Sequence, residues 1–164
     1  MKYNNYDNAC YLGNQNNPYV VLVKAIDKYR TTYSINAGTK VIGSTAFCGC
    51  SNLTNITIPD SVTMIGSSAF ENCSSLTSIA ISDSVTIIGY SAFENCNSLT
   101  SITIPDSVTM IDTSTFAGCK TLTEVTIGEG VKNIRSYAFK NCISLERISY
   151  HGTKAQWDAI RKRS

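Results

Sequence analysis

The stretch SVTMIGSSAFENCSSLTSIAISD, residues 61–83, is followed at once by SVTIIGYSAFENCNSLTSITIPD, residues 84–106, and 18 of the 23 positions are identical. The same 23-residue step continues in both directions as columns of like residues. Two of these columns are Phe47, Phe70, Phe93, Phe116 and Phe139, and Cys50, Cys73, Cys96, Cys119 and Cys142. A fixed period between about 20 and 50 residues is the signature of a repeat array, and a propeller blade needs roughly 40 residues or more. The period therefore predicts a solenoid with one coil per copy.

One copy contains three segments of different character. In residues 76–81, LTSIAI, the apolar residues have the spacing of the short inward-facing strand of a leucine-rich repeat. Residues 84–89, SVTIIG, predict a second extended stretch that ends in a turn at Gly89. In residues 91–96, SAFENC, the apolar residues have helical spacing, which predicts about one turn of helix. A single coil cannot bury its own apolar side, so stacked neighbours must supply the core.

These segments predict an α/β-type solenoid of five coils over residues 38–152, with short parallel strands on the concave side and one-turn helices opposite. The terminal coils need caps, because they otherwise expose core and strand edges. Residues 1–37 are expected to form an N-terminal cap, in which segments 17–26 and 29–36 pair as a β-hairpin. Residues 153–164 are expected to form a C-terminal capping helix, because Thr153 and Gln156 have the spacing of a capping box and Trp157 follows them.

The phenylalanine and cysteine columns are expected to form the structural core. Buried thiols behave as small apolar side chains, and pairing within a column of five cysteines would leave one thiol over. The other two cysteines, Cys10 and Cys48, lie outside the column, and no second pair with metal-ligand spacing accompanies the CGC of residues 48–50. The sequence therefore predicts neither a metal site nor a cofactor.

Composition and charge restrict the classes of function. The chain has 164 residues, of which 16% are charged, and a net charge of +2, which argues against a nucleic-acid partner. No segment reaches the roughly 18 consecutive apolar residues of a membrane span, so no membrane insertion is expected. Residues 1–17 lack the apolar centre of a signal peptide, so the chain is either intracellular or a mature form or excerpt without its export signal. The one histidine, His151, has no second histidine with which to build a nucleophilic centre, so no enzymatic activity is expected.

Three residues depart from the repeat in its last two copies. Asp112 replaces a glycine, Thr115 replaces an alanine, and Gly130 replaces the serine that opens a coil. We expect these changes to bend the array locally.

The repeated pattern SVTxIGxSAFxNCxSLTSIxIPD resembles the BspA-type leucine-rich-repeat family. The similarity covers residues 38–152 and reaches the flanking segments YLGNQNNPYVVLVKA and YHGTKAQWDAI. The resemblance implies a cell-surface or secreted protein without enzymatic activity. It also implies a role in adhesion, with host matrix or plasma proteins such as fibronectin and fibrinogen as partners.

The residues between the core positions of each strand are expected to face outward on the concave side. They form columns of small polar side chains, in which charges occur only in the last two copies. The candidate binding face comprises Asn55, Thr57, Ser78, Thr100, Ser101, Thr103, Glu124, Thr126, Arg147 and Ser149. We expect this face to hold a protein or a glycan, and the chain to act as a monomeric adhesion module. The alternative is a spacer or stalk segment that positions another domain and has no ligand of its own.

Overall fold

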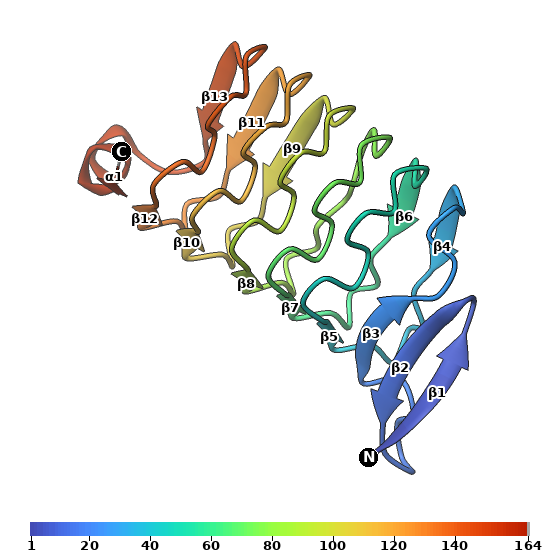
Figure 1. Ribbon diagram of the computed structural model, residues 1–164. Coiled ribbons are helices and arrows are strands. Elements are labelled where there is room, and N and C mark those ends of the chain that lie inside the picture. Colours follow the sequence, from blue (N-terminus) through green and yellow to red (C-terminus); the bar gives the residue numbers. More distant parts are fainter. Residues whose placement is uncertain (164) are drawn as a thin grey trace.

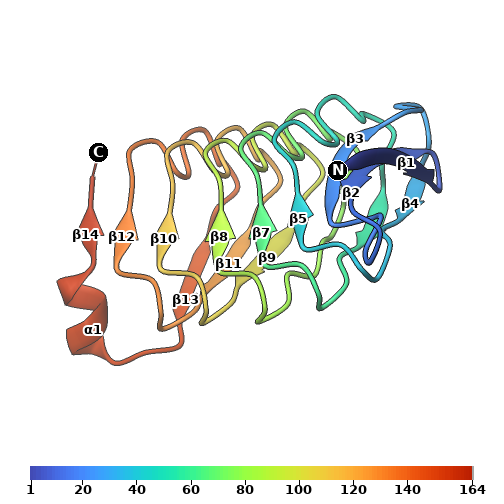
Figure 2. The ribbon, with the colours of Figure 1, turned by 90° about the horizontal axis from the view of Figure 1, so that it is seen from below.

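The computed structural model describes residues 1–163, which form an elongated array of coils stacked side by side (Figure 1). Two rows of strands run along the array. The long-strand row consists of β4 (Thr32–Ser34), β6 (Asn55–Thr57), β9 (Ser101–Ile104), β11 (Glu124–Ile127) and β13 (Arg147–Tyr150). The short-strand row, seen in Figure 2, consists of β3 (Val21–Ala25), β5 (Val41–Ile42), β7 (Met64–Ile65), β8 (Ile87–Ile88), β10 (Met110–Ile111), β12 (Asn133–Ile134) and β14 (Arg161–Lys162). The architecture is a β-solenoid, as the period predicts.

Within the repeats, paired strands have a constant offset of one repeat. β11 pairs in parallel with β9 on one side and β13 on the other, so that Val125 lies between Ile102 and Ile148. In the short-strand row, β5 pairs with β7 and β7 pairs with β8 at the same offset. Because successive residues of a strand point to opposite faces, this offset stacks apolar residues on apolar residues inside the array and polar residues on polar residues outside it.

The phenylalanine column forms a continuous stack through the array. The ring centroids of successive phenylalanines are 5.2, 5.3, 5.5 and 5.6 Å apart, and the ring planes are within 6° of parallel. The rings of Phe47, Phe70, Phe93 and Phe116 are fully buried, whereas Phe139 in the last repeat is half-buried. Each coil therefore completes the core of its neighbours.

The predicted one-turn helices are wrong, because these segments form series of tight turns. In residues 91–96, the N–H groups of Ser91, Phe93 and Asn95 donate to carbonyls of the next coil at 2.8–3.0 Å. The N–H groups between them donate to the carbonyl three residues back in their own coil. An α-helix bonds successive N–H groups within its own segment, and Ser91 and Asn95 have positive φ angles of 51° and 59°. Bonding to the next coil thus replaces the helix, and α1 (Lys154–Ala159) is the only α-helix within residues 1–163.

The predicted number of five coils is one too few. β4 pairs in parallel with β6 at the same one-repeat offset, so that Tyr33 lies beside Ile56. The Tyr33 ring is buried against Phe47, with the two ring centroids 5.2 Å apart. Residues 32–34, which were predicted to belong to the N-terminal cap, therefore belong to the first of six coils.

The predicted hairpin between residues 17–26 and 29–36 is also wrong. β3 lies in the short-strand row and β4 in the long-strand row, so these two strands do not pair. Instead β1 (Lys2–Tyr6) and β2 (Ala9–Gly13) form an antiparallel hairpin, and β2 continues the sheet to β3. The turn residues Asp7 and Asn8 have φ angles of 43° and 57°, as a type I′ turn requires. Asp7 accepts a hydrogen bond from the Ser34 N–H at 2.6 Å, which ties the hairpin to the first coil.

Helix α1 begins with the capping box that the sequence predicts. The Thr153 hydroxyl accepts from the Gln156 N–H at 3.2 Å, and the Gln156 side chain accepts from the Thr153 N–H at 2.7 Å. The Trp157 ring packs 5.4 Å from the Tyr150 ring, between centroids, and Ile160 is buried. Ser164, the last residue of the predicted cap, lies outside the described residues. In the described part of the chain, no helix has the length and apolar character needed to cross a membrane.

Both rows of strands are interrupted at the same coil boundary. Pairing stops between β8 and β10 and between Ala80 and β9. The Thr86 N–H donates to the Thr63 carbonyl in the preceding coil, but the Thr109 N–H makes no such bond within residues 1–163. Ala80 replaces a threonine of neighbouring coils, and Asp112 replaces a glycine; at the equivalent Gly89, a Cβ would lie 2.6 Å from a backbone nitrogen of the preceding coil. We expected local bending at Asp112, and the structure shows lost strand pairing there.

Hydrogen exchange should report this interruption. We expect the backbone amides of Thr109 and Asp112, in the middle of the array, to exchange faster than those of Thr86 and Gly89. The latter two donate to the preceding coil, each at 2.9 Å, and amides without such bonds open more easily. Residue-resolved hydrogen–deuterium exchange by NMR measures all four. Equal protection of the four amides would contradict the interruption.

Candidate functional site

The outward side chains of the long-strand row form the candidate site, which we call the long-strand face. Six predicted residues share the sheet of β9, β11 and β13, namely Ser101, Thr103, Glu124, Thr126, Arg147 and Ser149. Strand pairing places Glu124 between Ser101 and Arg147 in one column, and it places Thr126 in the column beside it. This part of the predicted face is one continuous surface. Its concave position stays a prediction.

None of the other four predicted residues lies in this sheet. Asn55 and Thr57 are exposed on β6, beyond the interruption, and Thr57 pairs with Ala80 through a single bridge. Ser78 is exposed but belongs to no strand, and Thr100 immediately precedes β9. A cavity of about 350 Å³ opens at the interruption, between residues 78–81 and 101–103. The ten predicted residues therefore form two surfaces with a hollow between them.

The charged residues of the face are paired with each other. Arg147 Nη1 lies 3.4 Å from Glu124 Oε1, and the Arg147 side chain is 71% exposed. Exposed ion pairs contribute at most about 1 kcal/mol to stability. A ligand that binds either charge must therefore compete with this pair.

A column of threonines beside the face joins the coils, a role that was not predicted from the repeat pattern. The hydroxyls of Thr54, Thr77 and Thr123 each donate to the carbonyl 23 residues earlier, at 3.0–3.2 Å. The backbone N–H of the same three residues donates to the same carbonyls. Thr100, predicted to contact a ligand, belongs to this column, and its carbonyl accepts the Thr123 hydroxyl. Recurrence of the same residue in four successive copies was the available signal.

Comparison with protein families agrees with this repeat geometry. The family described as "BspA type Leucine rich repeat region" matches residues 30–158 in six copies. The chain belongs to this family. The matched range begins before residue 38 and includes β4, in agreement with the six coils of the structure. No curated protein matches the chain.

Solved structures of bacterial leucine-rich-repeat proteins are similar to this BspA-type chain. A leucine rich cell surface protein from Faecalibacterium prausnitzii is 37% identical, with a TM-score of 0.91 over 97% of this chain and 42% of that protein. A leucine-rich repeat protein from Eubacterium ventriosum is 27% identical, with a TM-score of 0.76 over 99% of this chain and 48% of that protein. One from Bacteroides ovatus is 31% identical, with a TM-score of 0.60 over 89% and 43%. The chain spans less than half the length of these three proteins.

The cysteine column of this BspA-type array forms a ladder of S–H hydrogen bonds. The thiols of Cys73, Cys96, Cys119 and Cys142 each donate to the phenylalanine carbonyl 26 residues earlier, at 3.1–3.2 Å. Burial raises the pKa of Cys119 to about 12 and that of Cys50 and Cys142 to about 11. These thiols are consequently packing groups that hold their protons. In the described part of the chain, no His, Cys, Asp or Glu side chains form a group of three suited to a metal ion.

Thiol labelling of the folded protein should therefore be selective. At about pH 8, where thiol labelling proceeds through the thiolate, we expect two of the seven cysteines, Cys10 and Cys48, to react rapidly with a disulfide reagent. Both lie outside the cysteine column and are half-exposed. Cys142, at the end of the column, is also half-exposed, but its thiol donates to the Phe116 carbonyl at 3.1 Å. The other five should react only on unfolding, because burial raises the pKa of their thiols. Rapid reaction of more than two thiols, read by absorbance before and after adding denaturant, would contradict this assignment.

Proposed function

We propose that the chain is a non-enzymatic binding module of a cell-surface or secreted protein, and that it holds its ligand against the long-strand face. The observation that carries the proposal is the alignment of polar side chains over three paired strands, β9, β11 and β13. A regular sheet surface of this kind suits a large partner that lies flat against it. BspA-type repeats are generally surface and protein-interaction repeats, and one similar structure is described as a cell surface protein.

The ligand class that we propose is a host matrix or plasma protein, or a glycan. Tight protein interfaces are anchored by tryptophan, tyrosine and arginine. On the sheet of β9, β11 and β13, the predicted face offers small hydroxyls and one arginine, Arg147, which is paired with Glu124. Affinity must then come from many weak contacts repeated along the array. We propose that the chain binds as a monomer.

Surface-based binding tests this proposal. The immobilised chain is exposed to fibronectin, fibrinogen, laminin, collagen and a glycan array. We expect saturable binding that is lost in the double variant Thr103→Lys/Thr126→Lys, since both side chains lie on the long-strand face. The matched control is Thr86→Lys/Thr109→Lys, which adds the same charges to exposed threonines next to the short-strand row. Both variants are compared at unchanged melting temperature.

Two other outcomes would change the proposal. Binding that survives in the Thr103→Lys/Thr126→Lys variant but not in the control would place the ligand on the short-strand side. Failure of all panel members to bind at tens of micromolar would favour the alternative, a spacer segment. The scarcity of large anchoring side chains on the sheet of β9, β11 and β13 is the observation that supports this alternative.

A further inference from the structure

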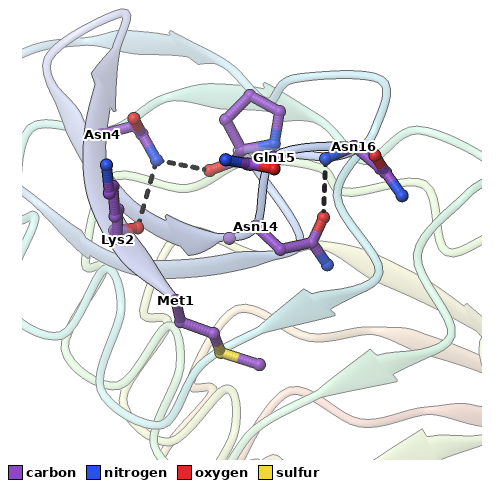
Figure 3. A pocket seen from close by; sticks show the side chains of 8 residues that line it. Met1, Lys2, Asn4, Asn14, Gln15 and Asn16 are labelled. Carbon is purple, nitrogen blue, oxygen red and sulfur yellow. Dashed lines mark hydrogen bonds between the residues drawn. The ribbon is translucent and has the colours of Figure 1, made fainter.

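A second polar site lies at the N-terminal end of the array, on the hairpin of β1 and β2. A pocket of about 540 Å³ opens between β1 and the loop that follows β2 (Figure 3). Its polar side chains are those of Lys2 and Asn4 from β1 and Asn14, Gln15 and Asn16 from the loop. The volume is in the range of about 300–1,000 Å³ that is typical of small-molecule sites.

Hydrogen bonds fix the loop side of the pocket. The Asn14 side-chain oxygen accepts from the N–H groups of Asn16 and Asn17, each at 2.9 Å. Asn17 in turn donates from its side chain to the Gly38 carbonyl at 2.6 Å and accepts from the Tyr19 N–H at 3.0 Å. The loop is therefore joined both to itself and to the start of the repeats.

A second pair of bonds fixes the strand side. Asn4 Nδ2 donates to the Lys2 carbonyl at 3.1 Å and to the Pro18 carbonyl at 3.0 Å, which connects β1 to the end of the loop (Figure 3). A site whose walls are already held in place loses little conformational entropy when a ligand binds. The pocket is preorganised in this sense.

The amide groups left over after these bonds are available to a ligand. Within residues 1–163, Asn4 Oδ1, Asn14 Nδ2 and the complete side-chain amides of Gln15 and Asn16 make no hydrogen bond. Together they provide three NH₂ donors and three carbonyl acceptors, all uncharged. Sugar hydroxyls both donate and accept, so a ligand rich in hydroxyl groups matches this set of amides. A metal ion does not, because no carboxylate lines the pocket.

The charge of the pocket restricts the ligand further. Lys2 is the one lining residue with a charged side chain. We propose that the pocket binds an acidic oligosaccharide, whose hydroxyls pair with the amides of Asn4, Asn14, Gln15 and Asn16 and whose carboxylate pairs with the Lys2 ammonium. The site is separate from the long-strand face, and the proposal holds whether or not that face binds a ligand.

Titration of the whole chain with defined sugars, followed by NMR chemical shifts and calorimetry, tests the proposal. The probes are 3′-sialyllactose and a glucuronic-acid disaccharide as two sources of the acidic group, lactose as the neutral sugar, and acetate as an anion without hydroxyls. We expect at least one acidic sugar to bind saturably, lactose to bind more weakly, and acetate not to compete. Lys2→Gln should remove the difference between the acidic sugar and lactose.

Two further variants separate the pocket from the rest of the surface. Gln15→Ala/Asn16→Ala should weaken binding roughly tenfold, because two neutral hydrogen bonds are lost. Neither side chain makes a bond within the described protein, so the fold should be unaffected. The matched control is Asn5→Ala, which removes an exposed amide from the opposite side of β1 and should leave binding unchanged.

Three results would overturn the proposal: no saturable binding of either acidic sugar, equal competition by acetate, or equal weakening by Asn5→Ala. The variant Thr103→Lys/Thr126→Lys, which tests the long-strand face, should bind the acidic sugar as the unaltered chain does. A lack of binding at the pocket is thereby distinguished from a lack of binding at the long-strand face.

Discussion

Replacing Phe93 with alanine is expected to lower the free energy of unfolding by about 3–5 kcal/mol. The Phe93 ring is fully buried and lies between Phe70 and Phe116, with centroid distances of 5.3 and 5.5 Å and ring planes nearly parallel. Removing it opens a cavity in the middle of the stack, and the rings on either side lose their contacts with it. In a solenoid each coil contacts only its neighbours, so this one cavity weakens two interfaces between coils.

Phe139→Ala is the matched comparison, because it makes the same chemical change at the end of the stack. Phe139 is half-buried and has one stacked neighbour, Phe116, at 5.6 Å. We therefore expect a smaller loss than for Phe93→Ala. Urea unfolding of both variants, followed by circular dichroism, gives the two changes in free energy. An equal or larger loss for Phe139→Ala would show that burial in the stack does not control stability.

The regular part of this core could be predicted from the sequence, because the period itself determines which residues stack. Once a full repeat returns the chain to the same position in the next coil, like residues must lie on like residues. The columns that contain Phe93 and Cys96 then lie on the inside of every coil. The outward columns that contain Ser101 and Thr103 follow from the same argument, since neighbouring residues of a strand face opposite ways.

The turns and the first coil could not be predicted so directly, for two different reasons. The apolar spacing of residues 91–96 fits both a helix and a series of turns, and hydrogen bonds to the next coil decide between them. Asn72, Asn95 and Gly118 were a signal, because one repeat position in the left-handed region favours these residue types. In the first coil, stepping back one repeat from Ile56 and Ile58 leads to Tyr33 and Ile35, but the phenylalanine and leucine columns stop before it.

The polar pocket could not be predicted from the repeat period, because the residues that line it lie outside the repeats. Nothing in the sequence NQNNP indicates that Asn17 is used to hold the loop while Gln15 and Asn16 remain free. This distinction depends on contacts between Asn17 and Gly38, which are 21 residues apart.

Two substitutions that both restore the repeat pattern are expected to have opposite effects on stability. Gly130→Ser puts back the serine found at the same position in three other copies, Ser61, Ser84 and Ser107. We expect it to lower the free energy of unfolding by about 1–3 kcal/mol, as overpacking does. A Cβ at residue 130 would lie 1.9 Å from the Asp106 carbonyl oxygen and 3.0 Å from that of Val108. Both atoms belong to the backbone of the preceding coil, so neither can rotate away.

Ser82→Pro, the matched substitution, is expected to raise the free energy of unfolding by about 0.4–1 kcal/mol. Pro59 and Pro105 occupy the equivalent position in the adjacent copies, so the backbone of this turn accepts proline. Ser82 also has a buried hydroxyl without a hydrogen-bond partner in the described residues, and proline removes it. Urea unfolding of both variants measures the two changes on one scale. Stabilisation by Gly130→Ser, as by Ser82→Pro, would contradict this prediction. It would mean that the turn at residues 128–130 can adopt the geometry of the other coils. Agreement with the repeat pattern would then predict stability better than the contacts between coils do.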